Sequence, residues 1–161
     1  MVDTRSPEQR SRIMQSVKTA HTGPEMTARR LLHSMGYRYR LHPKELPGKP
    51  DIVFRGRKAA IFVHGCFWHG HECQKGNAPK SRLDYWGPKL AANRARDCMQ
   101  VEKLEAMGWR VLTIWQCEIK DEDELRGRLH DFLGPPNFRS TAKLESVSLS
   151  DTARKAQRGN T

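Results

Sequence analysis

An apolar run leads directly into a dense group of metal-ligand and aromatic side chains in Ala59-Ala60-Ile61-Phe62-Val63-His64-Gly65-Cys66-Phe67-Trp68-His69-Gly70-His71-Glu72-Cys73. The apolar residues 59–63 are typical of a buried β-strand. Residues 64–73 hold two cysteines, three histidines and two adjacent aromatics. Because a hydrophobic core does not require this combination, we predict a strand that delivers metal ligands and large flat side chains to one place.

The segments on either side predict a mixed sheet. Upstream, Asp51–Phe54 and Ala59–His64 flank the turn Arg55–Lys58 and predict a β-hairpin. Downstream, a helical pattern over Lys89–Met107 precedes the strongly apolar strand Trp109–Trp115. A helical crossover is what two parallel strands require, so the last strand is expected to pair in parallel with Ala59–His64.

Two helices and a strand are predicted before this region, and one helix after it. Ser6-Pro7-Glu8-Gln9 and Thr22-Gly23-Pro24-Glu25 have the pattern of capping boxes. Tyr37–Leu41 alternates aromatic and basic residues and predicts a strand, and Asp121-Glu122-Asp123-Glu124 opens a final helix. The sequence therefore predicts an α/β fold with one mixed sheet covered by helices.

The length of 161 residues suits a single domain with its own core. We expect an N-terminal helical segment at 1–20, a core at 21–133 and a tail at 134–161. The tail is polar and rich in Ser, Thr, Lys and Arg, which predicts disorder.

The charge of the chain indicates a phosphate-bearing partner. It carries 29 Lys+Arg against 18 Asp+Glu, a net charge of +11. Proteins this basic usually meet nucleic acid or an anionic membrane surface. No apolar run approaches the roughly 20 residues of a membrane span, and the N-terminus lacks the apolar core of a secretion signal. We therefore expect a cytoplasmic nucleic-acid-binding protein rather than a chain whose charge serves solubility alone.

Cys66, His71 and Cys73 place three metal ligands within eight residues. A structural Zn²⁺ takes four, and Cys117 follows the last predicted strand by two residues. If that strand pairs in parallel as predicted, Cys117 arrives beside Cys66. The alternative is that Cys117 is a small buried residue and the cluster binds metal weakly or not at all. Cys98 falls on the apolar face of the crossover helix and is expected to be a core residue.

His64 and His69 remain once His71 is assigned to the metal. Asp51 opens the neighbouring strand, where many metal-dependent nucleases hold Mg²⁺ through a carboxylate. A neutral histidine can serve as the base for a nucleophilic water at physiological pH. The alternative for Asp51 is a solvated acid in a surface turn.

Three segments carry a family resemblance: Leu46-Pro47-Gly48-Lys49-Pro50-Asp51, Ile61-Phe62-Val63-His64-Gly65-Cys66-Phe67-Trp68-His69-x-His71-x-Cys73 and Gly108-Trp109-Arg110-Val111-Leu112-Thr113-Ile114-Trp115-Gln116-Cys117. Together they resemble the very short patch repair (Vsr-type) DNA mismatch endonucleases, over roughly residues 5 to 132. The resemblance implies a restriction-endonuclease-like fold. It also implies a strand-specific nick 5′ of the thymine in a T·G mismatch, which arises when 5-methylcytosine is deaminated.

The same resemblance implies the setting of the reaction. The substrate is double-stranded DNA with a T·G mismatch, and the implied protein partners are a mismatch-repair matchmaker protein and a repair polymerase. The implied enzyme is a monomer in the bacterial cytoplasm, acting at the nucleoid.

Mapped residue by residue, the resemblance implies a catalytic Mg²⁺ held by Asp51 and by the backbone carbonyl of Val63. The family pattern has threonine at the second position, so valine keeps the carbonyl and loses any hydroxyl role. His69 is the implied general base, Asp97 resembles a residue that orients it, and His64 is a supporting group.

Glu25 is implied as a further supporting active-site group. Its place as the third residue after Thr22 gives it an equally good structural role in a capping box. The resemblance also assigns the structural zinc, in agreement with the spacing argument, to Cys66, His71, Cys73 and Cys117.

The DNA contacts implied by the resemblance are apolar wedges. Phe67, Trp68 and Trp86 would enter the base stack from the major-groove side, which costs least at a mispair. Met14 and Val17 would clamp from the opposite side, although on the sequence alone they form an ordinary apolar helix face. The alternative for Phe67 is packing beneath the metal loop. Lys and Arg of the first helix and of the loop 75–82 are expected to contact phosphates.

Two other functions remain open at this point. A zinc-stabilised DNA-binding module without chemistry would explain the charge, the cysteines and the aromatics, but would leave Asp51, His64 and His69 without a role. A nuclease of the same fold could instead act on a different DNA substrate.

Overall fold

A four-stranded sheet forms the centre of the part of the chain that the computed structural model describes, residues 6–18, 20–77, 80 and 82–137. The strands lie in the spatial order β1 (Arg40–Leu41), β2 (Ile52–Phe54), β3 (Ala59–His64) and β4 (Arg110–Trp115). β1, β2 and β3 pair antiparallel, whereas β3 and β4 pair in parallel with His64 opposite Trp115. The mixed sheet and the predicted parallel pair are therefore confirmed.

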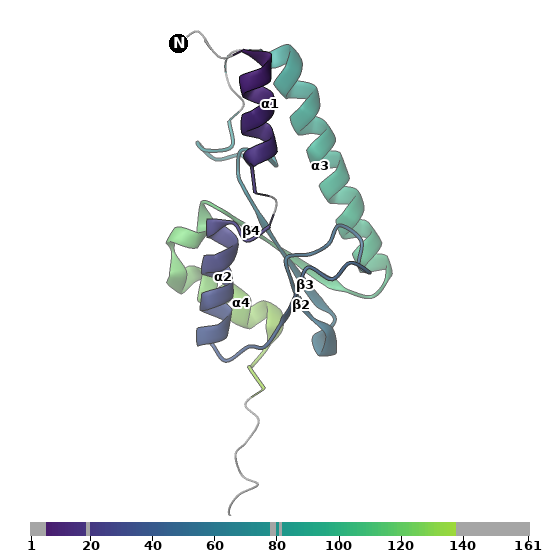
Figure 1. The fold of residues 1–161 in the computed structure, drawn as a ribbon. Helices are drawn as coiled ribbons and strands as arrows, with labels where there is room; N and C mark the ends of the chain where they lie inside the picture. Colours follow the sequence, from purple (N-terminus) through teal and green to yellow (C-terminus); the bar gives the residue numbers. More distant parts are fainter. Residues whose placement is uncertain (1–5, 19, 78–79, 81, 138–161) are drawn as a thin grey trace, which may run out of the picture.

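Helices cover both faces of this sheet (Figure 1). α2 (Gly23–Ser34) and α4 (Glu122–Leu133) lie on one face, and the crossover helix α3 (Leu83–Ala106) lies on the other. Alternate strand residues point to the two faces: Ile52 and Ile61 pack with α2 and α4, whereas Val53 and Phe62 pack with Leu104 of α3. The described chain is thus a three-layer α/β domain.

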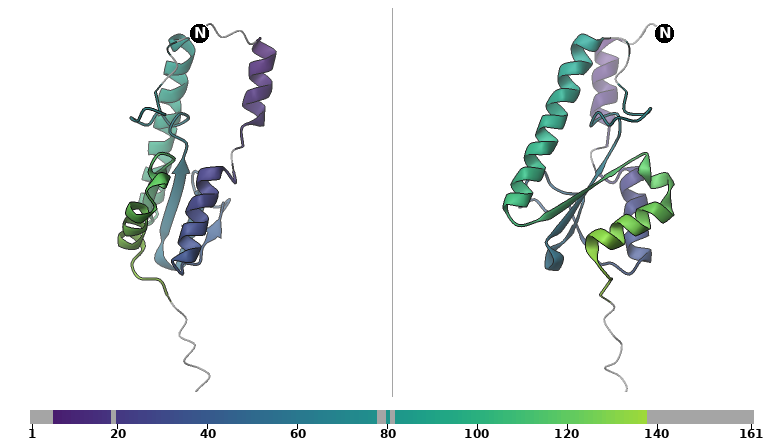
Figure 2. Two further views of the ribbon diagram at one scale, coloured as in Figure 1. Left: turned by 90° about the vertical axis from the view of Figure 1, so that its left-hand side faces the viewer. Right: turned by 180° about the vertical axis from the view of Figure 1, so that it is seen from behind.

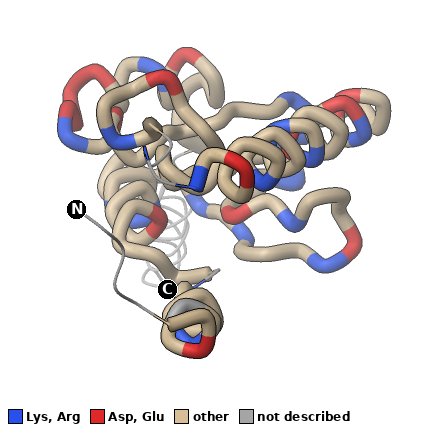
Figure 3. Tube along the Cα trace, turned by 90° about the horizontal axis from the view of Figure 1, so that it is seen from above, with Lys and Arg blue, Asp and Glu red and all other residues tan. Residues whose placement is uncertain are grey.

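α1 (Pro7–Ser16) stands apart from the three layers (Figures 2 and 3). Its predicted capping box is confirmed: the Gln9 N–H donates to the Ser6 hydroxyl at 3.3 Å, and the Ser6 N–H donates to the Gln9 side chain at 3.0 Å. Met14 and Val17 are half-buried, and Ile13 is exposed. α1 is therefore a helix with a complete N-terminal cap that lies beside the core rather than within it.

The crossover helix begins earlier than predicted. It starts at Leu83 instead of Lys89, so Trp86 lies in its first turns and not in the preceding loop. Pro88 lies inside the helix. Proline usually marks the first turn of a helix, and for that reason the sequence pattern places the start too late.

The inward face of α3 also differs from the prediction, because Cys98 is exposed rather than in the core. Leu90 and Leu104 are buried on the inward face, and between them the polar Asn93 and Asp97 are half-buried. A search for apolar periodicity misplaces the inward face because two of its positions are polar: Asn93 bonds to the Trp68 carbonyl and Asp97 to the His69 ring.

The predicted strand at Tyr37–Leu41 shortens to β1, because Tyr37 belongs to the core. Its side chain is buried, its ring meets Phe54 edge to face, and its hydroxyl donates to the Gly134 carbonyl at 2.5 Å. The tail predicted from Gly134 onward lies outside the described residues after position 137. None of the helices described here combines the length and apolar character that crossing a membrane would need.

Gly48 lets the loop before β2 pass close to α3. Its φ is +71°, and a Cβ there would lie 2.8 Å from the Gln100 Cβ and 3.1 Å from the Phe62 ring. Both the backbone conformation and the space require glycine. The close approach holds the loop that delivers Asp51, three residues further on.

We expect Gly48→Ala to destabilise the fold by about 1–3 kcal/mol, because it adds a left-handed backbone strain to an overpacked contact. Urea unfolding measures the change. Gly56→Ala is the matched control, since a Cβ at Gly56 meets nothing within 4 Å. Equal stability of the two variants would contradict the predicted role of Gly48.

Candidate active site and metal centre

Asp51 immediately precedes β2, and its carboxylate lies against β3. Its Oδ2 accepts a hydrogen bond from the Val63 N–H at 2.7 Å. Burial raises the pKa of Asp51 to about 6, against the lowering effect of that hydrogen bond. A cation bound at this carboxylate would favour its charged form and offset the cost of burial.

Asp51 opens onto a cleft of about 530 Å³ lined by β3 and α3. The walls include His64, His69 and Asp97, and also the cationic residues Lys49 and Arg96. The fold therefore brings the predicted catalytic carboxylate and histidines to one place. It adds two positive side chains at the same cleft, which suit a phosphate-bearing ligand.

His69 is held by the crossover helix. Its Nδ1 lies 2.6 Å from the Asp97 Oδ2. Because an ionised carboxylate only accepts hydrogen bonds, Nδ1 carries the proton in this pair, and Nε2 of the neutral ring keeps its lone pair. This arrangement fits the predicted base and the residue that orients it.

His64 stacks flat on His69, with ring centroids 3.8 Å apart and planes 5° from parallel. Burial, followed by the charge of His69, lowers the pKa of His64 to about 4, so its ring is neutral at physiological pH. The ligand atoms of His64, His69 and Asp97 cluster closely enough to suggest a cation site. The lone pairs of two stacked rings, however, run parallel rather than converge, which fits a pair of positioned imidazoles better than a metal site.

Glu25 is 1% exposed, and its carboxylate belongs to a polar network instead of a complete capping box. The Glu25 N–H donates to the Thr22 hydroxyl at 3.4 Å, but the carboxylate pairs with Arg29 and lies 2.8 Å from the His42 Nε2. His42 Nδ1 lies 4.0 Å from the Asp51 Oδ1. The predicted capping box is therefore half-formed, and Glu25 is linked through His42 to the cleft.

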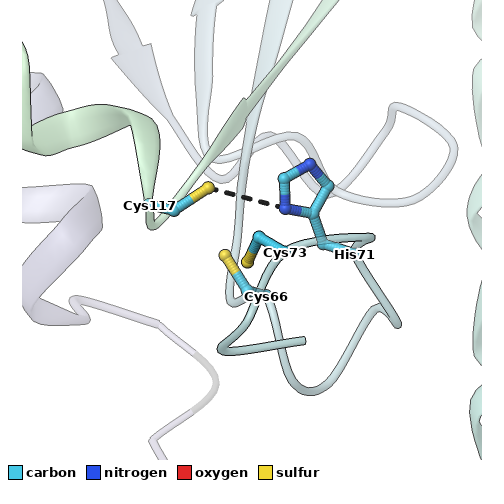
Figure 4. Close-up of side chains that lie close together, drawn as sticks. All are labelled: Cys66, His71, Cys73 and Cys117. Atoms are coloured by element: carbon cyan, nitrogen blue, oxygen red, sulfur yellow. Dashed lines mark hydrogen bonds between the residues drawn. The ribbon is translucent and has the colours of Figure 1, made fainter. Parts of the chain in front are cut away.

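Three cysteines and a histidine converge in a separate cluster (Figure 4). Cys66 follows β3, His71 and Cys73 lie in the next loop, and Cys117 follows β4. Their ligand atoms all lie within 4.8 Å of one another, with Cys117 Sγ 3.5 Å from His71 Nδ1. The predicted arrival of Cys117 beside Cys66 is thus confirmed, and a donor set of three thiols and one imidazole fits a tetrahedral metal site.

The loop is shaped to hold these ligands. The His71 N–H donates to the Cys66 carbonyl at 2.9 Å, and the His71 ring stacks on Trp115 with centroids 4.3 Å apart. A Cβ at Gly76 would lie 1.8 Å from the His71 carbonyl oxygen, so only glycine fits there. Burial, with hydrogen bonds and charge from the neighbouring thiols, raises the pKa of Cys117 to about 11. Gathering three thiolates is unfavourable without a cation, and a bound metal would remove that cost.

One aromatic cluster joins Phe67 and Trp68, in the loop after β3, to Trp86 in the first turns of α3. Phe67 meets both tryptophans edge to face, with centroid separations of 5.1 and 5.2 Å. All three residues are half-buried. Asn93 of α3 donates to the Trp68 carbonyl at 2.9 Å and holds the loop in place. The cluster is therefore fixed to the same loop and helix as His69 and its partner.

The sequence pattern does not single out Arg29, His42 or Trp115, although all three touch the site. Arg29 lies four residues after Glu25, and this spacing of opposite charges on a helix could have indicated the pair. Trp115 lies opposite His64 in the parallel register, so its place follows from the predicted pairing. No local signal marks His42.

Known proteins are similar to this chain in sequence. The profile of the family described as DNA mismatch endonuclease Vsr matches residues 2–75. The DNA mismatch endonuclease Vsr of Escherichia coli (strain K12) is 35% identical over 125 residues, which are 78% of this chain and 80% of that protein. This chain belongs to the Vsr family.

Another Vsr-like relative is the type II nicking enzyme V.XorIIP of Xanthomonas oryzae pv. oryzae. It is 57% identical over 135 residues, which are 84% of this chain and 99% of that protein. A solved structure, the catalytic domain of the homing endonuclease I-Bth0305I, gives a TM-score of 0.48 at 23% identity and covers 69% of this chain and 93% of that one. On the family and its relatives, the chain is a strand-specific DNA nicking endonuclease, and the alternative of a DNA-binding module without chemistry is wrong.

We expect Asp51→Asn to stabilise this Vsr-family protein when no divalent cation is added. The folded state holds a proton on Asp51 up to about pH 6, whereas the unfolded chain releases it near pH 4, so the stability contributed by this group falls between those values. Asparagine can still accept the Val63 N–H but carries no charge. Its advantage should be near zero at pH 4 and reach about 2–3 kcal/mol at pH 8.

Urea unfolding at several pH values measures this difference. Asp131→Asn is the surface control, because the Asp131 side chain is 89% exposed. A constant difference between Asp51→Asn and the parent from pH 4 to pH 8 would contradict the prediction.

Proposed function

We propose that this chain is a Mg²⁺-dependent endonuclease of restriction-endonuclease-like architecture that hydrolyses the phosphodiester 5′ of the thymine in a T·G mismatch. The nick would initiate very short patch repair of deaminated 5-methylcytosine. One observation carries the proposal: the aromatic cluster of Phe67, Trp68 and Trp86 is fixed to the same loop and helix that hold His69 and Asp97. Base recognition and cleavage are thus joined by one rigid segment.

Asp51 and the backbone carbonyl of Val63 are the proposed Mg²⁺ ligands. Both lie where β2 and β3 meet, and oxygen atoms are the donors that Mg²⁺ prefers. When bound, Mg²⁺ neutralises the scissile phosphate and stabilises the leaving oxygen. Valine at position 63 can serve as well as threonine, because the proposed ligand is the main-chain carbonyl oxygen.

His69 accepts the proton of the attacking water at Nε2, while Asp97 holds the Nδ1 proton and orients the ring. His64 remains neutral beneath it, so His69 can become positive without a second charge stacked against it. Glu25 acts through His42, which lies between it and Asp51. Lys49 and Arg96 are placed at the cleft to attract the phosphate.

The proposed wedge is the aromatic cluster. Unstacking a base step costs a few kcal/mol, and least at a mispair, so a rigid wedge favours T·G over paired DNA. Phe67 contacts both tryptophans. It therefore packs within the cluster and also forms part of the proposed wedge. Residues 1–20 would clamp the DNA from the opposite side through Met14 and Val17, and residues 21–133 would form the nuclease core.

We propose that the Cys66, His71, Cys73 and Cys117 cluster holds a structural Zn²⁺. The cluster takes three of its four residues from the loop that also carries Phe67, Trp68 and His69. We further propose that the enzyme acts as a monomer in the bacterial cytoplasm, at the nucleoid, with a mismatch-repair matchmaker protein and a repair polymerase as partners.

We expect Asp51→Asn and His69→Gln to lower the rate of nicking at least 100-fold on a T·G duplex with Mg²⁺, because each removes a group used in the transition state. Single-turnover cleavage of end-labelled duplexes with varied flanking sequence measures the rate. Cys98→Ala, at an exposed position of α3, should cut like the parent. Nicking that survives in both variants would refute the assigned roles.

The substrate is tested with the same duplexes carrying T·A in place of T·G. We expect the paired duplex to be cut far more slowly. Equal rates would remove the mismatch from the proposal and leave a nicking endonuclease with a different DNA substrate, as the names of the type II nicking relatives allow.

We expect one tightly held zinc per chain in the parent and in Cys98→Ala, and a zinc that a chelator removes far more readily in Cys117→Ala, whose tetrahedral site lacks one ligand. Elemental analysis of the folded proteins after treatment with a chelator measures the metal. The variant should also melt at a lower temperature, because binding of the metal contributes to folding. Zinc held as tightly in Cys117→Ala as in the parent would contradict the four-ligand site.

A further inference from the structure

Two residues of the catalytic cleft have a left-handed backbone conformation that side chains rarely adopt. In the part of the chain that the structure describes, residues other than glycine with a positive φ are His21, His42, Lys49, Lys58 and Arg82. Of these, His42 and Lys49 line the cleft that holds Asp51. Such conformations persist only where the surrounding structure enforces them, and they gather at functional sites.

Lys49 is the less expected of the two. Histidine and asparagine are several-fold enriched at positive φ, whereas lysine is not. The φ of Lys49 is +49°, and both neighbours hold it there: Gly48 packs closely against α3, and Pro50 is buried. The turn itself would form with less strain around glycine or asparagine. A lysine at this position therefore points to a task for its side chain.

The Lys49 ammonium has no structural task among the described residues. Arg96, the other cation named at the cleft, donates to the Asn93 Oδ1 at 3.1 Å, whereas no hydrogen bond or ion pair of the Lys49 side chain occurs within the described chain. Lys49 does not compensate Asp51 either. Burial raises the pKa of Asp51, and the charged side chains that act on it are Glu25, His42 and Arg29.

We propose that Lys49 is a catalytic residue whose ammonium binds a non-bridging oxygen of the scissile phosphate and stabilises the negative charge that builds there as water attacks. The inference rests on the proposed function, because it needs the reacting phosphate to lie at Asp51. The ammonium donates hydrogen bonds throughout and neither gains nor loses a proton. The proton of the water goes to His69, as proposed above.

The strained backbone fits this role better than simple attraction of DNA. A charge that only attracts phosphates acts over roughly 8–10 Å, so it could stand on any unstrained surface position nearby. A charge that must meet one oxygen atom gains from a fixed point of departure. Lys49 leaves the chain two residues before Asp51, in a turn fixed by Gly48 and Pro50, and donors positioned in advance are the ones that stabilise a transition state most.

The test is single-turnover nicking by the full chain with Mg²⁺, on whichever duplex the parent cuts and with enzyme in excess. We expect Lys49→Asn to lower the saturated rate about 100-fold. Its binding, measured without Mg²⁺, should weaken only as the loss of one phosphate contact requires. Lys49→Arg keeps the charge and should recover most of the rate. Lys44→Asn removes an exposed lysine of the same loop that does not line the cleft, and should cut like the parent.

The backbone strain gives a readout that does not depend on activity. Because asparagine tolerates the left-handed conformation, Lys49→Asn should melt about 2–4 °C above the parent, whereas Lys44→Asn should not. The expected result is thus a variant that is more stable and less active. A lysine that served only to hold the loop would lose stability on the same change.

Two outcomes overturn the inference. If Lys49→Asn reaches the parent's rate once binding is saturated, the lysine only attracts DNA. If Lys49→Asn melts below the parent, the lysine stabilises the loop and the strain argument fails. Failure of the proposed function is read separately: a parent that does not cut T·G refutes the substrate, and an Asp51→Asn enzyme that cuts like the parent refutes the metal ligand.

Discussion

The parallel pairing of β3 with β4 is the constraint on which the rest of the site depends. Its register places His64 opposite Trp115, so the chain leaves both strands at the same end of the sheet. Cys66 and Cys117 are the second residues after these strand ends, and they meet there with the ligands of the intervening loop. Slipping the register by one residue would turn every side chain to the other face of the sheet and separate the ligands.

Side chains occupy the outer edge of β4, the last strand of the sheet in the described residues. The Trp115 N–H, which points away from β3, donates to the Glu118 carboxylate at 2.9 Å, and Arg128 of α4 pairs with that carboxylate at 2.9 Å. Arg128 also reaches the Thr113 carbonyl at 3.5 Å. These contacts occupy backbone groups that would otherwise be open to strand addition, and they hold the strand end that delivers Cys117.

The fold could be predicted from the sequence where local pattern and global arrangement agree. The apolar strand at Ala59–His64 and the helical crossover pattern before Trp109 were sufficient to predict the parallel pair. The parallel pair was then sufficient to predict that Cys117 lies beside Cys66. The face of α3 could not be predicted in this way. Its inward positions Asn93 and Asp97 are polar because they bond to the loop and to His69, and a pattern that looks for apolar residues passes over them.

The polar network at Glu25 could not be predicted from the sequence for a different reason. Arg29 and His42 come from separate elements, and their meeting depends on how α2 packs against the loop after β1, a tertiary arrangement that no local spacing encodes. The resemblance to a family indicates that Glu25 belongs to the site, but says nothing of what neutralises it.

The charges around the cleft explain why Asp51 is its least compensated carboxylate. Glu25 is matched by Arg29, and Asp97 lies against His69. Asp51 has a backbone N–H at one oxygen and a histidine 4.0 Å from the other, and its pKa is raised because no partner compensates fully for its burial. In a chain with a net charge of +11, the cleft thus keeps one under-compensated carboxylate. A divalent cation would stabilise this carboxylate, and Lys49 and Arg96 give the same cleft two positive charges that suit a phosphate-bearing ligand.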